Sequence, residues 1–136
     1  QYGLSQEHKH LPEMQKICGL NYMPVFCPIV APFARGMEVT IPIFSNQLKC
    51  SKDNLIELYK NTYQSKIVHY DDESENGFIS ASYYAGRDDM GISVYGNSDR
   101  IILVSRFDNL GKGASGAAIQ NMNLLLGADE TTGLVL

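Results

Sequence analysis

The sequence predicts an α+β domain built on a mostly antiparallel sheet. Several short runs alternate apolar and polar residues or are rich in β-branched residues, which is typical of strands. Three longer runs space their apolar residues as a helix does. The strand-like runs are joined mainly by short turns, which favours hairpins over crossover connections. A chain of 136 residues is long enough to form one such domain with its own core.

The first helix is expected within residues 11–19, LPEMQKICG. Pro12 suits the first helical turn, because an N–H would have no partner there. Glu13 lies near the positive end of the helix dipole, and Gly19 can end the helix. One face carries the side chains of Met14, Ile17 and Cys18.

Two strands are expected in the next part of the chain. Residues 23–33, MPVFCPIVAPF, are apolar but interrupted by prolines, which cannot donate to a sheet, so they predict an edge or irregular strand. Residues 36–44, GMEVTIPIF, alternate and predict a regular strand. A turn at residues 34–36, ARG, would let the two strands pair as an antiparallel hairpin. The apolar face of the second strand would carry Met37, Val39, Ile41 and Ile43.

The rest of the chain predicts two helices and further strands. A helix over residues 52–64 can be capped by Ser51, and its buried stripe would be Leu55, Ile56, Tyr59 and Tyr63. Strand-like runs occupy residues 66–70, 78–84, 90–96 and 100–107, with a hairpin turn at 97–99. The last helix runs from Ser115 to Leu126, with Gly127 beyond it and one apolar face of Ile119, Met122 and Leu126. In total, five or six strands and three helices are expected.

Composition excludes several classes of function. The net charge of −4 and the absence of a Lys/Arg stripe disfavour nucleic-acid binding, and no apolar run is long enough to span a bilayer. Three cysteines, Cys18, Cys27 and Cys50, are odd in number and lack C-x-x-C spacing, which favours buried thiols in a reduced, cytoplasmic setting. Gln1 is not a natural start, so we expect the chain to be a piece of a longer protein.

The glycine-rich segment contains a formal G-x-G-x-x-G at Gly111, Gly113 and Gly116. A dinucleotide-binding turn would open a βαβ unit, with an acidic residue about twenty positions further on. Too few residues follow Gly116 for that unit. Two interpretations remain: exposed amides that receive an anion or an amide ligand, and, favoured over it, a tight strand-to-helix turn whose small residues allow close packing.

The histidine pair His8 and His10 stands just before the first helix, close to Glu7 and Glu13. A neutral imidazole beside a carboxylate can act as a general base near neutral pH, whereas two solvated loop histidines would give the same pattern. A metal site could use both histidines with His69 as a distant third ligand. We disfavour it, because a metal needs three or four converging ligands.

Three segments carry a resemblance to a known family: HKHLPEM at 8–14, GMEVTIPIF at 36–44 and DNLGKGASGAAIQNMNLLLG at 108–127. In order and spacing the chain resembles the carboxyl-terminal part of N-acetyl-gamma-glutamyl-phosphate reductase, in its shorter bacterial subtype. This family is similar to aspartate-semialdehyde dehydrogenase and glyceraldehyde-3-phosphate dehydrogenase, whose C-terminal domains have a mostly antiparallel sheet with helices on one face. The resemblance implies NADPH-dependent reduction of N-acetyl-glutamyl phosphate in cytoplasmic arginine biosynthesis, by a homodimer or homotetramer.

The resemblance also assigns roles to residues. His8, with His10 as the alternate, would transfer the proton, and Tyr2 and Glu13 would orient the imidazole or line the pocket. Arg35 would bind the phosphate or carboxylate of the substrate. The cofactor contacts would come from Asn109, which matches the residue that holds the nicotinamide amide, and from Gly113, Ala114, Ser115 and Gly116.

Two parts of the family's enzyme are expected to lie outside this chain. The dinucleotide-binding domain and the nucleophilic cysteine both precede the histidine segment in the family, and none of the three cysteines here takes that role. Residues 1–136 would therefore form the C-terminal substrate and dimerisation domain, inactive alone. The alternative is a non-catalytic dimerisation or small-ligand-binding module derived from the same fold.

Overall fold

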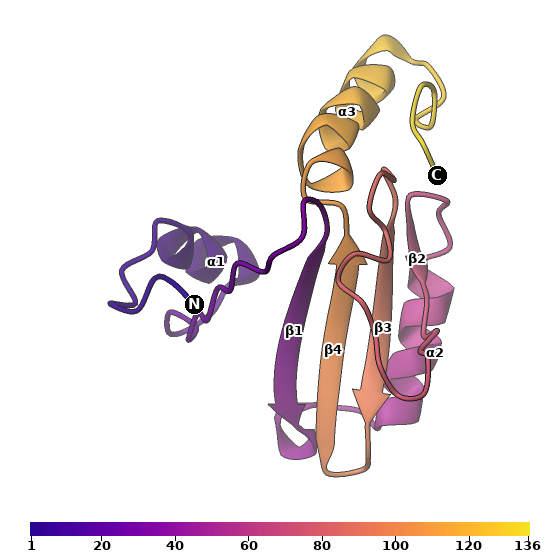
Figure 1. Ribbon diagram of the computed structural model, residues 1–136. Coiled ribbons are helices and arrows are strands. Elements are labelled where there is room, and N and C mark those ends of the chain that lie inside the picture. Colours follow the sequence, from indigo (N-terminus) through magenta and orange to yellow (C-terminus); the bar gives the residue numbers. More distant parts are fainter. The chain divides into compact units, whose positions relative to one another are not determined.

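The computed structural model describes residues 1–136, which divide into two units, Gln1–Pro32 and Phe33–Leu136. The first unit contains helix α1, His10–Cys18, between two stretches without regular secondary structure (Figure 1). Gly19 ends the helix in a left-handed conformation, with φ of 63°, which confirms the predicted end. The predicted apolar face is not a buried one, because Ile17 and Cys18 are exposed and Leu11 is the buried residue of this helix.

The proline-containing segment of the first unit forms no strand. Residues 24–31 have no regular structure, and the predicted hairpin with residues 36–44 is wrong, because that strand pairs elsewhere. Side-chain hydrogen bonds hold the segment instead. The Gln6 amide donates to Phe26 O at 2.7 Å and accepts from Phe26 N at 2.9 Å, while Tyr2 N donates to Pro28 O at 3.1 Å.

A four-stranded sheet forms the centre of the second unit, in the order β1-β4-β3-β2 (Figure 1). Its strands are β1, Met37–Phe44; β2, Val68–Tyr70; β3, Met90–Gly96; and β4, Arg100–Phe107. β4 is antiparallel to both neighbours, and only the short β2 runs parallel to β3. The predicted α+β class with a mostly antiparallel sheet is therefore confirmed, although four strands form rather than five or six.

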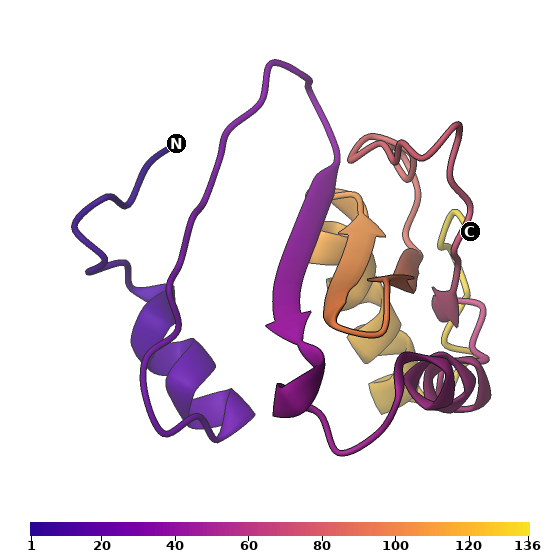
Figure 2. The ribbon, with the colours of Figure 1, turned by 90° about the horizontal axis from the view of Figure 1, so that it is seen from below.

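Helix α2, Lys52–Thr62, packs against the β2–β3 half of the sheet (Figures 1 and 2). Ser51 caps the helix as predicted, its hydroxyl accepting a hydrogen bond from Asn54 N at 3.2 Å. Leu55 forms the core together with Val94 and Ile101. The partly buried side chains around this core are Leu48, Ile56, Tyr59, Tyr70 and Leu103. Tyr63, predicted in the stripe, is 39% exposed and packs edge-on against Tyr59 instead.

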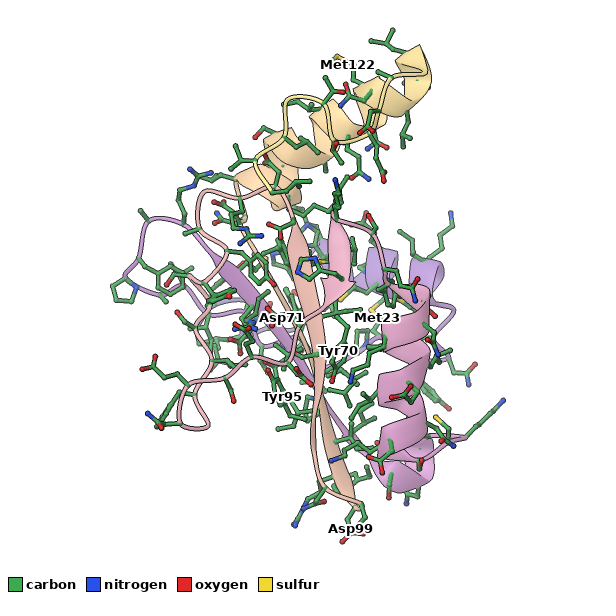
Figure 3. The ribbon with its side chains drawn as sticks, turned by 90° about the vertical axis from the view of Figure 1, so that its right-hand side faces the viewer. Met23, Tyr70, Asp71, Tyr95, Asp99 and Met122 are labelled. Carbon is green, nitrogen blue, oxygen red and sulfur yellow. The ribbon has the colours of Figure 1, made fainter.

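The opposite face of the sheet is covered in part by the segment 71–89, as the edge-on view in Figure 3 shows. The predicted strand at 78–84 is wrong, because residues 81–86 form turns. Tyr84 of that segment lies over the sheet, where it is buried against Gly91. Gly91 lies on the face opposite Val94, since side chains three apart on a strand point to opposite sides.

Gly91 is the position where added volume would cost most in this layer. A Cβ there would lie 2.2 Å from the Tyr84 hydroxyl, which is itself held by hydrogen bonds to His69 and Asp71. Gly91→Ala is expected to lower the free energy of unfolding by about 3 kcal/mol, measured by urea denaturation. Gly113→Ala, whose Cβ would meet the Phe107 ring at 3.1 Å, is the matched control and should cost less than about 1 kcal/mol. Equal losses in the two variants would contradict this packing argument.

Helix α3, Gly116–Leu126, follows a π-helical turn at Gly111–Ser115 and ends at Gly127 as predicted. Its predicted apolar face is wrong, because Met122 and Leu126 are exposed (Figure 3). Asn123 is buried in its place, and its side-chain amide donates to the carbonyl oxygens of Glu130 and Thr132. The helix therefore uses a polar side chain to hold the returning C-terminal residues.

All three cysteines, Cys18, Cys27 and Cys50, are exposed free thiols, so the prediction of buried thiols is wrong. Their exposure follows from position: Cys18 lies in the last turn of α1, Cys27 in the irregular segment and Cys50 in the loop before α2. None of the helices combines the length and apolar composition that a membrane crossing requires.

Candidate active site

His8 is held in the first unit by three aromatic rings. Its ring centroid lies 5.8 Å from that of Tyr2, 4.7 Å from that of His10 and 5.1 Å from that of Phe26. The backbone of Phe26 is fixed by the hydrogen bonds of the Gln6 side chain described above. The imidazole is half-buried, so its orientation is set by packing as well as by polar contacts.

One ring nitrogen of His8 has a backbone partner. Nδ1 accepts a hydrogen bond from His10 N at 3.3 Å, which places the proton of the neutral ring on Nε2. The neutral imidazole therefore presents an N–H donor at its other end. Accepting a proton at Nε2 would require the other tautomer and the loss of this long hydrogen bond.

The other residues predicted in this unit differ in their environment. His10 is exposed at the start of α1, and Tyr2 packs edge-on against His8. Glu13 is exposed and makes no hydrogen bond or ion pair with either histidine; it lines a shallow hollow of about 300 Å³ together with His10. Their roles in a reaction stay predictions.

Arg35 and Asp108 form an ion pair in the second unit. The distance from Arg35 Nε to Asp108 Oδ2 is 2.8 Å. The Asp108 side chain is fully buried, whereas that of Arg35 is 43% exposed, and Asp108 is its only charged partner. Asp108 is therefore fixed inside the protein, whereas the Arg35 side chain is accessible to a ligand.

Asp108 is also bound by backbone amides from two segments. Oδ2 accepts from Gly86 N at 2.5 Å, and Oδ1 accepts from Leu110 N at 2.7 Å and Gly111 N at 3.1 Å. Burial alone raises the pKa of Asp108, but these three N–H donors and the Arg35 charge outweigh it, so the pKa lies below its ordinary value. Asp108 is therefore an ionised anchor that joins Arg35, the loop at Gly86 and the glycine-rich turn.

Asn109 binds the residue next to Arg35. Its Oδ1 accepts a hydrogen bond from Gly36 N at 2.9 Å, and its side-chain NH2 has no hydrogen-bond partner. Gly36 has a φ of 123°, and a Cβ there would lie 2.4 Å from Ala81 O, so only glycine fits between these two neighbours. Asp108 and Asn109, which directly follow β4, thus bind Arg35 and Gly36, which directly precede β1.

Four backbone amides of the glycine-rich turn are used inside the protein. Leu110 N and Gly111 N bind Asp108, Gly113 N donates to Asp108 O, and Ser115 N donates to Leu110 O. The close-packing interpretation agrees with these contacts, and the binding of an anion or an amide ligand by this turn stays a prediction. A Cβ on Gly111 would lie 2.3 Å from Arg87 O, and one on Gly116 2.3 Å from Asp88 Oδ1. Ala114 and Ser115 are exposed on this turn.

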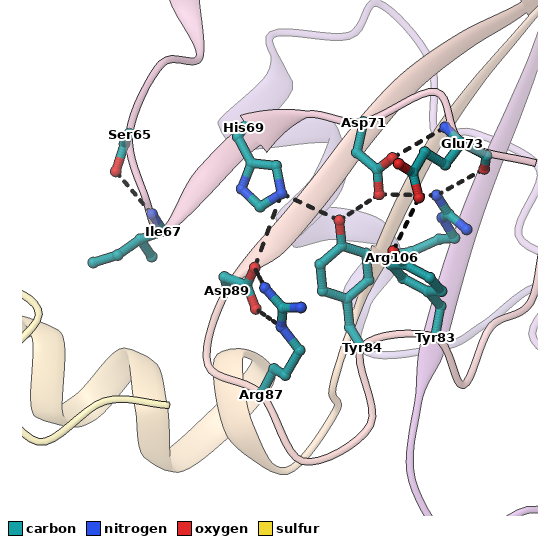
Figure 4. Close-up of polar contacts among 10 residues, drawn as sticks. All are labelled: Ser65, Ile67, His69, Asp71, Glu73, Tyr83, Tyr84, Arg87, Asp89 and Arg106. Atoms are coloured by element: carbon teal, nitrogen blue, oxygen red, sulfur yellow. Dashed lines mark hydrogen bonds and ion pairs between the residues drawn. The ribbon is translucent and has the colours of Figure 1, made fainter. Parts of the chain in front are cut away.

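A second polar cluster lies under the segment 71–89 (Figure 4). Arg106 is buried and pairs with Asp71 at 3.1 Å, and Arg87 binds Asp89 through two contacts of 2.7 and 2.6 Å. Tyr84 donates to Asp71 at 2.5 Å, and its pKa is raised mainly by burial. These contacts pair the charges buried on the sheet, although Arg106 Nε has no hydrogen-bond partner. The members of the cluster are His69, Asp71, Glu73, Tyr83, Tyr84, Arg87, Asp89 and Arg106.

No group of three or more His, Cys, Asp or Glu side chains is placed to hold a metal ion. His69 lies in the polar cluster, where its Nε2 is 3.2 Å from the Tyr84 hydroxyl and 3.9 Å from Asp89. It belongs to the second unit, and His8 and His10 belong to the first.

The fold and its two residue groups define an α+β dimerisation domain of the semialdehyde dehydrogenase type. The family model described as "Semialdehyde dehydrogenase, dimerisation domain" matches residues 1–109, and the chain belongs to this family. It is 40% identical over 134 residues to proteins named N-acetyl-gamma-glutamyl-phosphate reductase from Brucella ovis, Brucella canis and Brucella abortus. The alignment covers 93% of this chain and 43% of those relatives, so the chain spans less than half of their length. The resemblance seen in the sequence is confirmed.

Sequence reasoning missed three parts of these groups. Gln6, which fixes the aromatic ring beside His8, is a polar residue in a loop and has no distinctive pattern. Asp108 could have been found as the one acidic residue directly after a strongly apolar strand. The polar cluster could not, because its members come from segments distant in sequence and only the fold brings them together.

Proposed function

We propose that this chain is the substrate-binding and dimerisation part of an NADPH-dependent N-acetyl-gamma-glutamyl-phosphate reductase of cytoplasmic arginine biosynthesis. The enzyme would reduce an acyl phosphate to an aldehyde. The arrangement that carries the proposal is Arg35, open to a ligand and anchored on Asp108, in a chain 40% identical to proteins of that name. An exposed guanidinium on a fixed base suits a substrate that bears both a phosphate and a carboxylate.

The rest of the enzyme would supply the dinucleotide-binding domain and the nucleophilic cysteine. The chain spans 43% of its relatives, and its own thiols are free and exposed on loops or at a helix end. We infer that they do not act as the nucleophile. The assembled enzyme would be a homodimer or homotetramer, in keeping with the dimerisation role in the family's description.

The reaction splits into two steps that suit these groups. A cysteine thiolate attacks the acyl carbon, the carbon–oxygen bond to phosphate breaks, and inorganic phosphate leaves with its electron pair. NADPH, when bound, supplies the hydride that reduces the resulting thioester. His8 would take the thiol proton in one tautomer and, with the proton on Nε2, donate to the oxygen where charge develops. His10 is the alternate bearer of this role, and Tyr2 and Glu13 would line the pocket.

The residues nominated for the cofactor fit an amide ligand better than an anion. The Asn109 side chain keeps its NH2 free as a donor to the carbonyl of a carboxamide, because its oxygen is used by Gly36 N. The amides of Gly113, Ser115 and Gly116 are already bonded within the turn, so Gly113, Ala114, Ser115 and Gly116 would contribute mainly close approach. NADPH itself would be bound mainly by the missing domain.

The test is the activity of the full-length protein with N-acetyl-glutamyl phosphate and NADPH. We expect release of phosphate and oxidation of NADPH in equal amounts by the full-length protein and neither by residues 1–136 alone. A full-length protein that folds and dimerises but oxidises no NADPH would support the alternative, a non-catalytic dimerisation or small-ligand-binding module. Robust turnover by the isolated chain would contradict the division of labour proposed here.

A further inference from the structure

We propose that Asp108 is a positioning residue that aims Arg35 at the anionic group of the substrate and makes the site selective for an oxyanion with two accessible oxygens. The proposal rests on the proposed function, because it takes the ligand of Arg35 to be the substrate's phosphate or carboxylate. It adds a role to Asp108, which would not touch the substrate itself.

The first argument is that the side chain of Arg35 is fixed at one edge only. Its Nε lies 2.8 Å from a carboxylate that is fully buried and already receives three backbone N–H donors. Such a carboxylate cannot move to follow the guanidinium. The remaining edge of the group, with its two terminal nitrogens, belongs to a side chain that is 43% exposed and has no other charged partner. The two terminal nitrogens of Arg35 are thus already oriented to donate hydrogen bonds to an oxyanion.

The second argument is that the backbone beneath Arg35 is fixed as well. Asn109 binds Gly36 N at 2.9 Å, and Gly36 lies against the backbone of residues 81 and 82 with no room for a Cβ. Asp108, which pairs with the Arg35 side chain, and Asn109, which binds the backbone N–H of Gly36, are neighbours in sequence. The side chain and the adjoining backbone of Arg35 are therefore held by the same short segment. A displacement of that segment would move the whole guanidinium rather than only its end.

The third argument concerns selectivity. A lysine at position 35 would place one ammonium group against Asp108 and leave no second edge for a ligand. An arginine held through Nε keeps two parallel N–H donors for two oxygens of a phosphate or carboxylate. The pair therefore prefers an oxyanion with two accessible oxygens, and it should reject a substrate analogue in which that group is an uncharged ester or amide.

The experiment measures KM for the acyl phosphate, kcat and thermal stability in the full-length protein. Arg35→Lys is expected to raise KM about tenfold or more at nearly unchanged kcat, and Arg35→Ala is expected to raise KM at least as much. Arg35→Lys keeps a cation beside Asp108, so its melting temperature should stay nearly unchanged. Asp108→Asn should raise KM by a similar factor in the wild-type background and by no further factor when combined with Arg35→Ala. Asp89→Asn is the matched control, since this buried carboxylate also pairs with an arginine but does not contact Arg35; it should lower stability and leave KM unchanged.

Two results would overturn the proposal: wild-type KM in Arg35→Lys, or an Asp108→Asn effect that is the same with and without Arg35. A readout independent of catalysis is hydrogen exchange of the Arg35 Nε–H by NMR in residues 1–136. Exchange should be slower in the wild type than in Asp108→Asn, and equal rates would also overturn the proposal. Failure of the proposed function shows differently, because the wild-type protein itself would then reduce no acyl phosphate.

Discussion

His8→Ala is expected to lower kcat of the full-length reductase by about two to four orders of magnitude, the usual contribution of a positioned proton-transfer group. The physical reason is the fixed orientation of this imidazole. Three aromatic rings surround it, and a backbone N–H occupies Nδ1, so a proton can be delivered from one defined nitrogen. The measurement is steady-state oxidation of NADPH with N-acetyl-glutamyl phosphate, with circular dichroism to show that the variant is folded.

His10→Ala is the matched control for this experiment. His10 is exposed, and its hydrogen bond to His8 Nδ1 comes from its backbone N–H, which alanine keeps, although alanine removes the ring contact at 4.7 Å. We expect less than about a tenfold fall in kcat, well below the loss for a proton-transfer group. A fall in His10→Ala that equals or exceeds the fall in His8→Ala would assign the proton transfer to His10 instead.

Asp108→Ala is expected to cost about 3–5 kcal/mol of unfolding free energy. Alanine would leave three backbone N–H groups without an acceptor, one of them on the buried Gly111, and would leave Arg35 without its partner. Urea denaturation at pH 7 measures the difference. Glu57→Ala, an exposed carboxylate on α2, should change stability by less than about 0.5 kcal/mol. A loss of less than about 1 kcal/mol in Asp108→Ala would contradict the role of anchor.

The same contribution should depend on pH. The pKa of Asp108 is lower in the folded protein than its ordinary value, so its ionised form stabilises the fold above the unfolded pKa of about 3.9. That stabilisation is lost as the pH falls through the lower folded pKa. The gap in unfolding free energy between the wild type and Asp108→Ala should therefore stay constant above about pH 5 and shrink below about pH 4.

Local sequence patterns predicted the elements whose signal is short-range. The helix after Ser51, the hairpin around residues 97–99, the strand at 36–44 and the helix end at Gly127 all follow from caps, turns and alternation. The pairing of β1 was beyond such patterns, because its partner β4 lies more than fifty residues further along the chain and a nearer apolar run was available. That nearer run contains prolines, which left its backbone unable to complete a ladder.

The errors in the sequence-based prediction have one cause in common: some side chains bind a neighbouring segment instead of packing into the hydrophobic core. In the 78–84 run, Tyr84 lies over Gly91, where hydrogen bonds hold it, and residues 81–86 form turns rather than a strand. On α3 the apolar residues stay exposed while Asn123 is buried, because its amide satisfies two carbonyl oxygens of the returning chain. Of the candidate site, residue types and motif spacing could nominate His8, Arg35 and Asn109, but not the anchoring by Asp108.

β1 lies at an edge of the sheet and is bonded to β4 along one side only. Its side chains Met37, Val39 and Ile41 are between 41% and 53% exposed. Such an edge is a template for pairing with another chain, and Pro42 interrupts its free row of N–H groups at one place only. Residues 1–136 produced alone should therefore aggregate when the protein is concentrated. The substitution Val39→Lys, which puts a charge on this edge strand, should reduce that aggregation.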